Sequence, residues 1–251
     1  MARLLLLALL LAGPHRPRAE LLVHAAASLT APLRELGDRF ERRTGERVAL
    51  SLGGSGALAR QIAEGAPGDL FFSADEASLD RLAQAGLLLA GTRRSLLGNS
   101  LVAVVRRDSP LPLAGPRDLL DERVTAVSVG EPQSVPAGIY ARAALGELGV
   151  WEALVPKLVP TDNDRAALAA VESGNVEAGL VYRTDAASSA RLRVAFALPE
   201  SPAMRISYPV AVLAGTARPE AARRLLDYLS SEEAAAVFRR HGFRTLTTSR
   251  R

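Results

Sequence analysis

The chain has no cysteine, only three histidines and few aromatic side chains, which make up 4% of its 251 residues. Without thiols it cannot form disulfides, thiolate zinc sites, iron–sulfur clusters or a cysteine nucleophile. Three histidines also disfavour a histidine-rich metal centre, and we expect no cofactor. The rest of the composition is that of a globular chain, because 48% of the residues are hydrophobic and 23% are charged. Such a chain can build a core, which excludes intrinsic disorder.

Long apolar runs are scarce as well. The run Leu4–Ala12, which follows the basic start Met1-Ala2-Arg3, has nine residues and is too short to span a bilayer. It has the length of the apolar region of a signal peptide, so we predict that residues 1–19 are a signal peptide cleaved after Ala19. The alternative is a buried N-terminal helix, but nothing gives the run a polar face. Since no cysteine follows it, we expect an unanchored protein in the periplasm.

The positive charge of the chain is concentrated at its start. The whole chain has 31 basic and 27 acidic side chains and a sequence pI of about 10.1, which suggests a nucleic-acid or membrane-surface partner. However, Arg3, Arg16 and Arg18 lie in the predicted signal peptide, and the remainder has 28 basic and 27 acidic side chains. We therefore expect no nucleic-acid partner.

Strand-like and helix-like segments alternate along the remaining chain, which is typical of an α/β fold with mainly parallel sheets. Helices are indicated by apolar stripes that end at glycine, as where Leu33, Leu36 and Phe40 precede Thr44-Gly45. The predicted strands are residues 21–25, 48–52, 69–73, 101–105, 124–129, 178–182 and 206–213. Further helices are predicted at 57–64, 78–85, 219–229 and 232–240 and from about Ala137 and Asp164.

Two proline-rich breaks divide the chain. They are Ser109-Pro110-Leu111-Pro112 and Pro199-Glu200-Ser201-Pro202, and they bracket a middle segment of about 90 residues. We predict two lobes joined by a hinge, with residues 20–104 and 205–251 in lobe 1 and residues 105–204 in lobe 2. In such folds a ligand binds at the carboxyl ends of strands, where loops lead into helix N-termini.

Three strand-to-helix turns are rich in small residues and hydroxyl groups: Ala25-Ala26-Ala27-Ser28-Leu29-Thr30, Gly53-Gly54-Ser55-Gly56 and Val135-Pro136-Ala137-Gly138. Each presents free backbone N–H groups at a helix N-terminus, which suits an anion. Capping of the helix by serine explains any one of them without a ligand. Three such turns in one chain favour an anion site, and the glycines at 53, 54 and 56 let the backbone come close to another group. A nucleotide P-loop is excluded because no lysine follows the glycines.

A serine hydrolase is the competing interpretation. The segment Gly53-Gly54-Ser55-Gly56-Ala57 is one residue away from the nucleophile-elbow pattern, and His241 follows late in the chain. Against this, too few strands precede Ser55 for an α/β-hydrolase, and Arg239-Arg240-His241-Gly242 has the pattern of a helix C-terminus. We therefore predict that the chain is not an enzyme.

Several motifs follow one another along the chain. They are Ala25-Ala26-Ala27-Ser28-Leu29-Thr30, Leu58-Ala59-Arg60-Gln61-Ile62, Gly65-Ala66-Pro67-Gly68-Asp69-Leu70-Phe71, Ser73-Ala74-Asp75, Leu96-Leu97-Gly98-Asn99-Ser100-Leu101, Val135-Pro136-Ala137-Gly138-Ile139-Tyr140-Ala141, Val181-Tyr182, Tyr208-Pro209-Val210-Ala211-Val212 and Tyr228-Leu229. In this order they resemble the periplasmic molybdate-binding proteins of ABC transporters over essentially the whole chain after residue 19. The resemblance implies a two-lobed type II periplasmic-binding-protein fold, in which each lobe is a mainly parallel sheet flanked by helices. The lobes would close about a hinge on a tetrahedral oxyanion.

The resemblance also implies the ligand set. Molybdate or tungstate would be held through its oxygens by the hydroxyl and backbone N–H groups of Ser28 and Ser55, the backbone N–H groups of Ala137 and Asp164, and the phenol of Tyr182. All of these are donors, which suits a fully ionised oxyanion, whereas a protonated phosphate needs an acceptor. Several helix dipoles and charge-assisted hydrogen bonds can share the buried charge. A permease and its ATPase would be separate chains, and we expect a monomer.

Position 164 departs from the family, in which an apolar residue such as valine is common. If only the backbone N–H faces the ligand, the Asp164 side chain can point away, where it caps the helix or pairs with Arg165. If its carboxylate faces the cleft, it repels a dianion and accepts a proton from phosphate or arsenate.

Other cargo in the same fold stays open, namely sulfate, phosphate or phosphonate, and ferric iron. Iron binders of this architecture generally combine tyrosines with carboxylates, and here Tyr140, Tyr182 and Tyr208 are too scattered to argue for iron.

Overall fold

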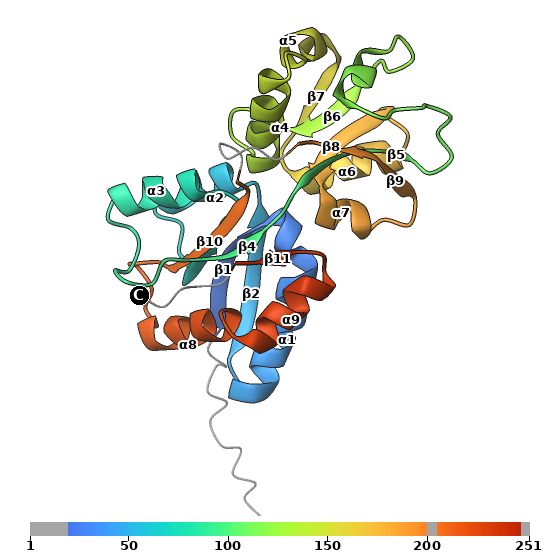
Figure 1. The fold of residues 1–251 in the computed structure, drawn as a ribbon. Coiled ribbons are helices and arrows are strands. Elements are labelled where there is room, and N and C mark those ends of the chain that lie inside the picture. Colours follow the sequence, from blue (N-terminus) through green and yellow to red (C-terminus); the bar gives the residue numbers. More distant parts are fainter. Residues whose placement is uncertain (1–19, 200–204, 247–251) are drawn as a thin grey trace, which may run out of the picture.

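Two β-sheets, each flanked by helices, form two lobes in the computed structural model (Figure 1). The structure describes residues 20–199 and 205–246, so the predicted signal peptide lies outside the described residues. Within these two ranges, no helix has the length and hydropathy of a membrane span. The predicted α/β fold with two lobes is confirmed.

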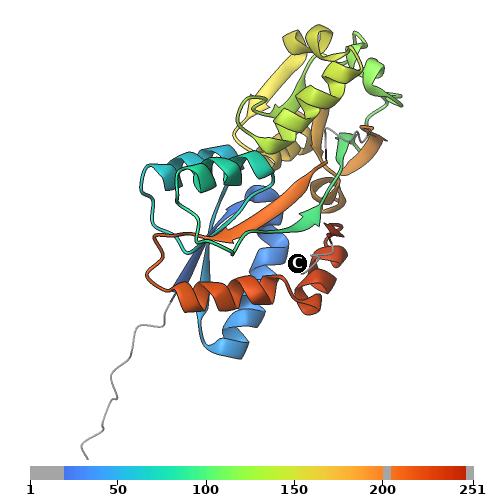
Figure 2. The same cartoon turned by 60° about the vertical axis from the view of Figure 1, so that its left-hand side comes forward.

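The first lobe is built on a six-stranded sheet with the order β11-β4-β10-β3-β1-β2. Its strands are β1 (Glu20–Ala26), β2 (Arg47–Gly53), β3 (Leu70–Phe72), β4 (Arg94–Gly98), β10 (Ser207–Val212) and β11 (Arg244–Thr245). Its helices are η1 (Ala27–Leu29), α1 (Thr30–Thr44), α2 (Ser55–Ala63), α3 (Glu76–Gln84), α8 (Pro219–Leu229) and α9 (Glu232–Arg240). Helices α2 and α3 cover one face of the sheet, and α1, α8 and α9 cover the other (Figure 2).

Alternation along β3 shows how this sheet is buried on both faces. Leu70 and Phe72 point to the side of α1, α8 and α9, where the rings of Phe72 and Phe238 meet edge to face at 6.0 Å. Phe71, between them, packs with Leu58 and the other apolar residues of α2 and α3. This is the two-residue period of a strand, and all three side chains are fully buried.

The second lobe is built on a five-stranded sheet with the order β7-β6-β8-β5-β9. Its strands are β5 (Leu101–Arg106), β6 (Val127–Gly130), β7 (Leu158–Thr161), β8 (Ala178–Tyr182) and β9 (Leu192–Ala197). Its helices are η2 (Pro116–Leu120), α4 (Pro136–Glu147), α5 (Trp151–Leu154), η3 (Val155–Lys157), α6 (Asp164–Glu172) and α7 (Arg183–Ala187). Val102 and Val104 of β5 pack with α6 and α7, whereas Ala103 and Val105 face the opposite side.

The strand pairings differ from the expected mainly parallel sheets. Among the described strands, four pairings are parallel and five are antiparallel. Each antiparallel pairing includes β4, β5 or β10, the strands at which the chain leaves the first lobe, enters the second and returns to the first. The parallel pairings join β1, β2 and β3 in the first lobe and β6, β7 and β8 in the second.

The chain passes from the first sheet to the second between β4 and β5. The predicted first boundary, between residues 104 and 105, falls inside β5, which pairs with β8 and β9. We therefore propose to move this boundary to Asn99 and Ser100. The second predicted boundary, between residues 204 and 205, adjoins residues 200–204, which lie outside the described part.

The two lobes meet through the loops that follow their parallel strands. A Cβ atom added to Gly56, at the start of α2, would lie 2.2 Å from the carbonyl oxygen of Ser134 in the second lobe. One added to Gly54 would lie 2.8 Å from the carbonyl oxygen of Asp162. The glycines of this turn therefore accommodate the backbone of the facing lobe, in an arrangement in which the lobes are closed on each other.

We predict that Gly56→Ala opens the lobes without unfolding them. Overpacking of this kind costs about 1–3 kcal/mol, enough to shift a two-state equilibrium about tenfold or more. Small-angle X-ray scattering should give a larger radius of gyration than for the unaltered chain. Gly146→Ala in α4 is the matched control, because an added Cβ there meets no atom within 4 Å. Identical scattering from Gly56→Ala and the unaltered chain would contradict this close contact.

Candidate functional site

The carboxyl ends of the parallel strands of both lobes point to the junction between the lobes (Figure 1). The five residues predicted from the sequence follow or end these strands. Ser28 follows β1, Ser55 follows β2, Ala137 follows β6, Asp164 follows β7, and Tyr182 is the last residue of β8. Ligands bind at this edge of open α/β sheets. All five residues are buried.

The helices that begin at the three small-residue turns have no side-chain cap. The N-cap residues of η1, α1, α2 and α4 are Ala26, Leu29, Gly54 and Val135, and none makes a side-chain hydrogen bond to its helix. By contrast, Asp75, Asn163 and Ser231 cap α3, α6 and α9 in the ordinary way. The interpretation that Ser28 and Ser55 merely cap these helices is therefore wrong. The first-turn N–H groups at these helices cannot be satisfied within the helix, so they can bind an external acceptor.

Ser55 is the first residue of α2, and its hydroxyl oxygen is already used as an acceptor. The backbone N–H of Ala74 donates to Ser55 Oγ at 2.9 Å, and the side chain is fully buried. The hydroxyl hydrogen of Ser55 is then left to donate. The same residue is not part of a hydrolase pair, since His241 caps α9 on the other face of the sheet and contacts Glu35 Oε2 at 3.2 Å.

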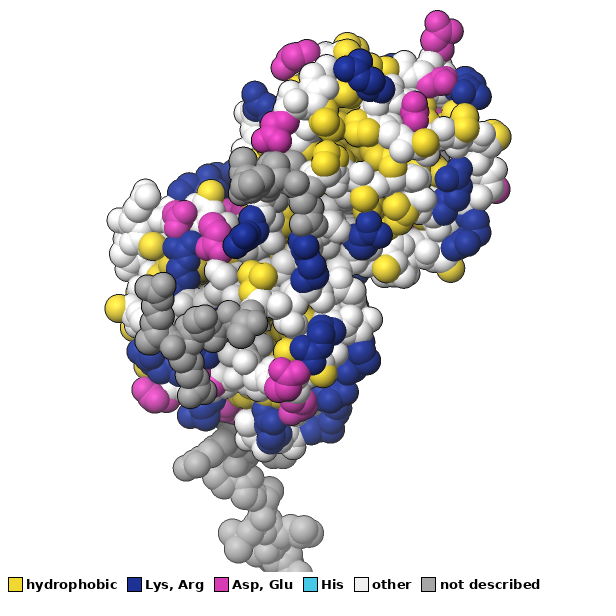
Figure 3. Space-filling model, viewed as in Figure 1, with side chains coloured by type: hydrophobic (Ala, Val, Ile, Leu, Met, Phe, Trp, Pro, Cys, Tyr) yellow, Lys and Arg dark blue, Asp and Glu magenta, His cyan; other side chains and the backbone are white. Residues whose placement is uncertain are grey.

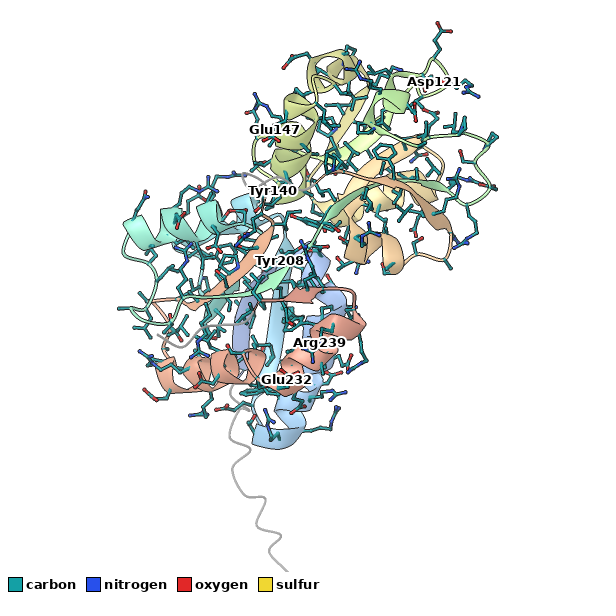
Figure 4. The ribbon with its side chains drawn as sticks, viewed as in Figure 1. Asp121, Tyr140, Glu147, Tyr208, Glu232 and Arg239 are labelled. Carbon is teal, nitrogen blue, oxygen red and sulfur yellow. The ribbon has the colours of Figure 1, made fainter. Side chains whose placement is uncertain are left out.

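Ser28 is linked to the second lobe through two tyrosines. Its Oγ lies 3.2 Å from the phenol oxygen of Tyr208, and the rings of Tyr208 and Tyr182 have their centroids 5.7 Å apart. In Figure 4, Tyr208 and Tyr140 both lie near the place where the lobes meet. Ser28 from the first lobe and Tyr182 from the second are thereby brought to one site.

The hydroxyl of Tyr182 is a buried donor without a partner among the described residues. The residue is fully buried, and burial raises its pKa well above the usual value for a phenol. The hydroxyl therefore keeps its hydrogen at any physiological pH. Since a buried polar group without a partner is rare in a folded protein, this hydroxyl fits a site for an acceptor ligand.

Asp164 does not cap its helix, and the charge of the adjacent Arg165 acts on its carboxyl group without a direct ion pair between the two side chains. Asn163 Oδ1 accepts from the backbone N–H of Ala166 at 2.9 Å and is the cap of α6. The guanidinium of Arg165 lies 3.1 Å from Oδ1 of the buried Asp185 instead. The Oδ2 atom of Asp164 is buried and has no hydrogen-bond partner among the described residues.

Asp164 and Asp185 form a pair of adjacent buried carboxyl groups. Burial raises the pKa of Asp164, and burial together with the charge of Asp164 raises the pKa of Asp185 well above its usual value. Two such groups hold a proton between them more readily than they both ionise. The raised pKa values favour retention of a proton by the pair, and the guanidinium of Arg165, 3.1 Å from Asp185 Oδ1, opposes this.

None of the five predicted residues carries a positive charge. Within residues 20–199 and 205–246, no group of three or more His, Asp or Glu side chains could hold a metal ion. On the face shown in Figure 3, basic and acidic side chains occur on both lobes. The groups of this site that can stabilise a negative charge are thus its helix N-termini and hydroxyl groups.

Four residues near the junction were not predicted as site residues from the sequence: Asn99, Thr184, Asp185 and Tyr208. Asn99 and Tyr208 lie in motifs that carry the family resemblance, but only their contacts reveal a role. Asn99 Nδ2 donates to Thr184 Oγ1 at 2.9 Å and to the phenol oxygen of Tyr208 at 3.0 Å.

We predict that Asp164→Asn stabilises the ligand-free protein increasingly as the pH rises. A carboxyl whose pKa is raised by folding contributes stability below its unfolded pKa, and this is lost as the pH passes its folded pKa. Asparagine removes that loss, so its melting temperature should exceed that of the unaltered chain by about 2–4 °C or more at about pH 8, and by less at about pH 5. Asp121→Asn is the control, since Arg123 lowers the pKa of that exposed carboxyl. A gain that shrinks with pH would contradict the shared proton.

Comparison with known proteins agrees with this geometry. The model of a family described as bacterial extracellular solute-binding protein matches residues 21–244. The molybdate-binding protein ModA of Escherichia coli (strain K12) is 39% identical over 230 residues, which cover 88% of this chain and 87% of that protein.

Solved structures show the same fold. The periplasmic molybdate-binding protein of Azotobacter vinelandii has a TM-score of 0.79 at 25% identity, covering 89% of this chain and 98% of that one. The substrate-binding domain of a putative molybdenum ABC transporter from Clostridium difficile has a TM-score of 0.69 at 32% identity, covering 91% and 99%. The two-lobed chain, with its uncapped helix N-termini directed to one junction, belongs to the bacterial extracellular solute-binding protein family.

Proposed function

We propose that this chain captures molybdate, and also tungstate, between its lobes and delivers it to an ABC importer. The observation that carries the proposal is the convergence of uncapped helix N-termini from both lobes with the unpartnered hydroxyl of Tyr182. Relatives that are named for molybdate binding support it, among them the Escherichia coli protein at 39% identity.

The proposed ligand set is the one expected from the sequence. Ser28 and Ser55 donate through their hydroxyl and backbone N–H groups, Ala137 and Asp164 through backbone N–H groups, and Tyr182 through its phenol. Ala137 follows Pro136, which has no N–H, so Ala137 supplies the first N–H of α4. Hydrogen bonds to a charged acceptor are stronger than neutral ones, and four helix N-termini share the charge.

Binding and closure are coupled in this proposal. The first lobe supplies Ser28 and Ser55, and the second supplies the other three residues, so the full set of donors exists only when the lobes are closed. An anion that binds the closed form more tightly shifts the population toward it. The closed form is what a permease, on a separate chain with its ATPase, would distinguish from the open form.

The remaining proposals concern where the protein works. A family described as extracellular fits export through residues 1–19 and action in the periplasm. We also propose that the exported chain is a monomer without a cofactor and without catalytic activity, since one site between two lobes suffices for capture.

A protonated oxyanion such as phosphate or arsenate is the second candidate. The observation that favours it is the buried Oδ2 atom of Asp164, an acceptor to which none of the described residues donates a hydrogen bond. Against it, the pair of Asp164 and Asp185 can hold a proton of its own, which leaves the pair less able to accept one from a ligand. We therefore propose molybdate as the ligand and not phosphate. No contact among the described residues specifically favours sulfate or phosphonate.

Calorimetric titration of the chain lacking residues 1–19 tests the proposal. We expect tight binding of molybdate and tungstate, weaker binding of sulfate and none of phosphate. At a hundredfold excess over the dissociation constant, molybdate should stabilise the fold by about 2.7 kcal/mol. Tyr182→Phe should weaken molybdate binding about tenfold, the cost of one hydrogen bond to a charged group. Preference for phosphate would establish the second candidate, and no heat with any oxyanion would contradict the proposed function.

A further inference from the structure

Four buried polar side chains form a continuous hydrogen-bonded chain across the junction of the lobes. Thr184 Oγ1, in the second lobe, accepts from Asn99 Nδ2 at 2.9 Å. The other contact of Asn99 Nδ2 is the phenol oxygen of Tyr208 at 3.0 Å, and this phenol lies 3.2 Å from Ser28 Oγ. Asn99 lies in the segment that connects β4 in the first lobe to β5 in the second. The hydrogen bonds therefore join this connecting segment to Ser28, a proposed ligand residue.

The orientation of the Asn99 amide is fixed by its neighbour. The backbone N–H of Ser100 donates to Asn99 Oδ1 at 2.9 Å, so this atom is the acceptor end of the amide. The NH₂ group then faces Thr184 and Tyr208, and each of its two hydrogens has a partner. A flipped amide would place two donors against each other at Ser100.

This orientation sets the direction of every hydrogen bond that follows. The oxygen of Tyr208 accepts from Asn99, which can only donate through its NH₂ group. The single hydrogen of the phenol is then directed to its other neighbour, Ser28 Oγ. Burial raises the pKa of Tyr208 well above the usual value, so the phenol keeps this hydrogen. Ser28 Oγ thus receives a hydrogen bond, and its own hydrogen is left for another acceptor.

We propose that Asn99 and Tyr208 are positioning residues that fix the Ser28 hydroxyl as a hydrogen-bond donor to the bound oxyanion. This inference rests on the proposed function and specifies how its selectivity arises. Ser55 has the same arrangement in a simpler form, because the backbone N–H of Ala74 occupies its oxygen. Both serines therefore present hydrogens and not lone pairs. An anion that carries its own hydrogen finds no acceptor at either serine, so fully ionised oxyanions are selected.

Removal of one hydroxyl tests this direction of donation. Tyr208→Phe leaves Ser28 free to turn its hydrogen away from the ligand, and we expect the dissociation constant for molybdate to rise about tenfold. Tyr228→Phe is the matched control. Its hydroxyl is also inside the first lobe, where it contacts Glu233 Oε1 at 3.1 Å on the side of α8 and α9. The control should change molybdate affinity by less than about twofold.

A double-mutant cycle separates positioning from a general loosening of the lobes. If Tyr208 acts through the Ser28 hydroxyl, Tyr208→Phe should have almost no further effect on affinity in a chain that already carries Ser28→Ala. Additive losses would overturn the inference, and so would an unchanged affinity of Tyr208→Phe alone. An unaltered chain that binds no molybdate would instead refute the proposed function, so the two failures are distinguishable.

Neutron diffraction from the unaltered chain with bound molybdate gives a second readout that does not depend on the folding of a variant. We expect the phenol deuterium of Tyr208 on the side of Ser28 and the hydroxyl deuterium of Ser28 on the side of the anion. A Ser28 deuterium directed to Tyr208 would overturn the inference.

Discussion

A doubly charged anion that is buried between two lobes loses its hydrogen bonds to water and must replace them with hydrogen bonds from the protein. The rest of this structure follows from that constraint. A lysine or arginine would supply the charge, but none is among the five predicted ligands. The protein instead offers the N-termini of α1, α2, α4 and α6 and three hydroxyl groups. Parallel strands bring these termini together, because β1 and β2 in one lobe and β6 and β7 in the other end at the same junction. Gly54 and Gly56 then allow the helix N-termini of the two lobes to approach each other closely.

Neutral donors are useful only if they cannot turn into acceptors. Backbone N–H groups meet this requirement by their chemistry, whereas a hydroxyl meets it only when its oxygen is occupied. In this protein the backbone N–H of Ala74 donates to the oxygen of Ser55, and we propose that Tyr208, held by Asn99, donates to that of Ser28. Three buried carboxyl groups, those of Asp75, Asp164 and Asp185, lie close enough to this set for Asp75 and Asp164 to act on Tyr182, and burial raises the pKa of each. In the function that we propose, selectivity and affinity have the same physical origin, the direction in which the hydroxyl hydrogens point.

Local patterns predicted most elements of the fold, because the residues that determine a strand or an amphipathic helix are close together in sequence. The predicted helix at 232–240 and strand at 178–182 match α9 and β8 in their bounds. The strands β4, β7, β9 and β11 were not predicted. Three of them, β7, β9 and β11, lie at sheet edges, where Pro160 in β7 is tolerated, whereas β4 lies inside the first sheet. The sequence predicted the three small-residue turns as parts of an anion site, which stays a prediction. It did not reveal a role for Tyr208, because its partner Ser28 lies 180 residues away in sequence. The surroundings of Asp164 were equally hidden, since Asp185 reaches it only through the packing of α6 against α7.

The most direct measurement of the central claim is a crystal structure of the chain without residues 1–19, grown with molybdate and located by the anomalous scattering of molybdenum. The account predicts one strong peak at the junction of the lobes, within hydrogen-bonding distance of the Tyr182 hydroxyl and of backbone N–H groups from α2, α4 and α6, with no lysine or arginine in contact. A peak in the cavity of about 280 Å³ that is lined by Arg183 and Arg244, with nothing bound between the lobes, would contradict it.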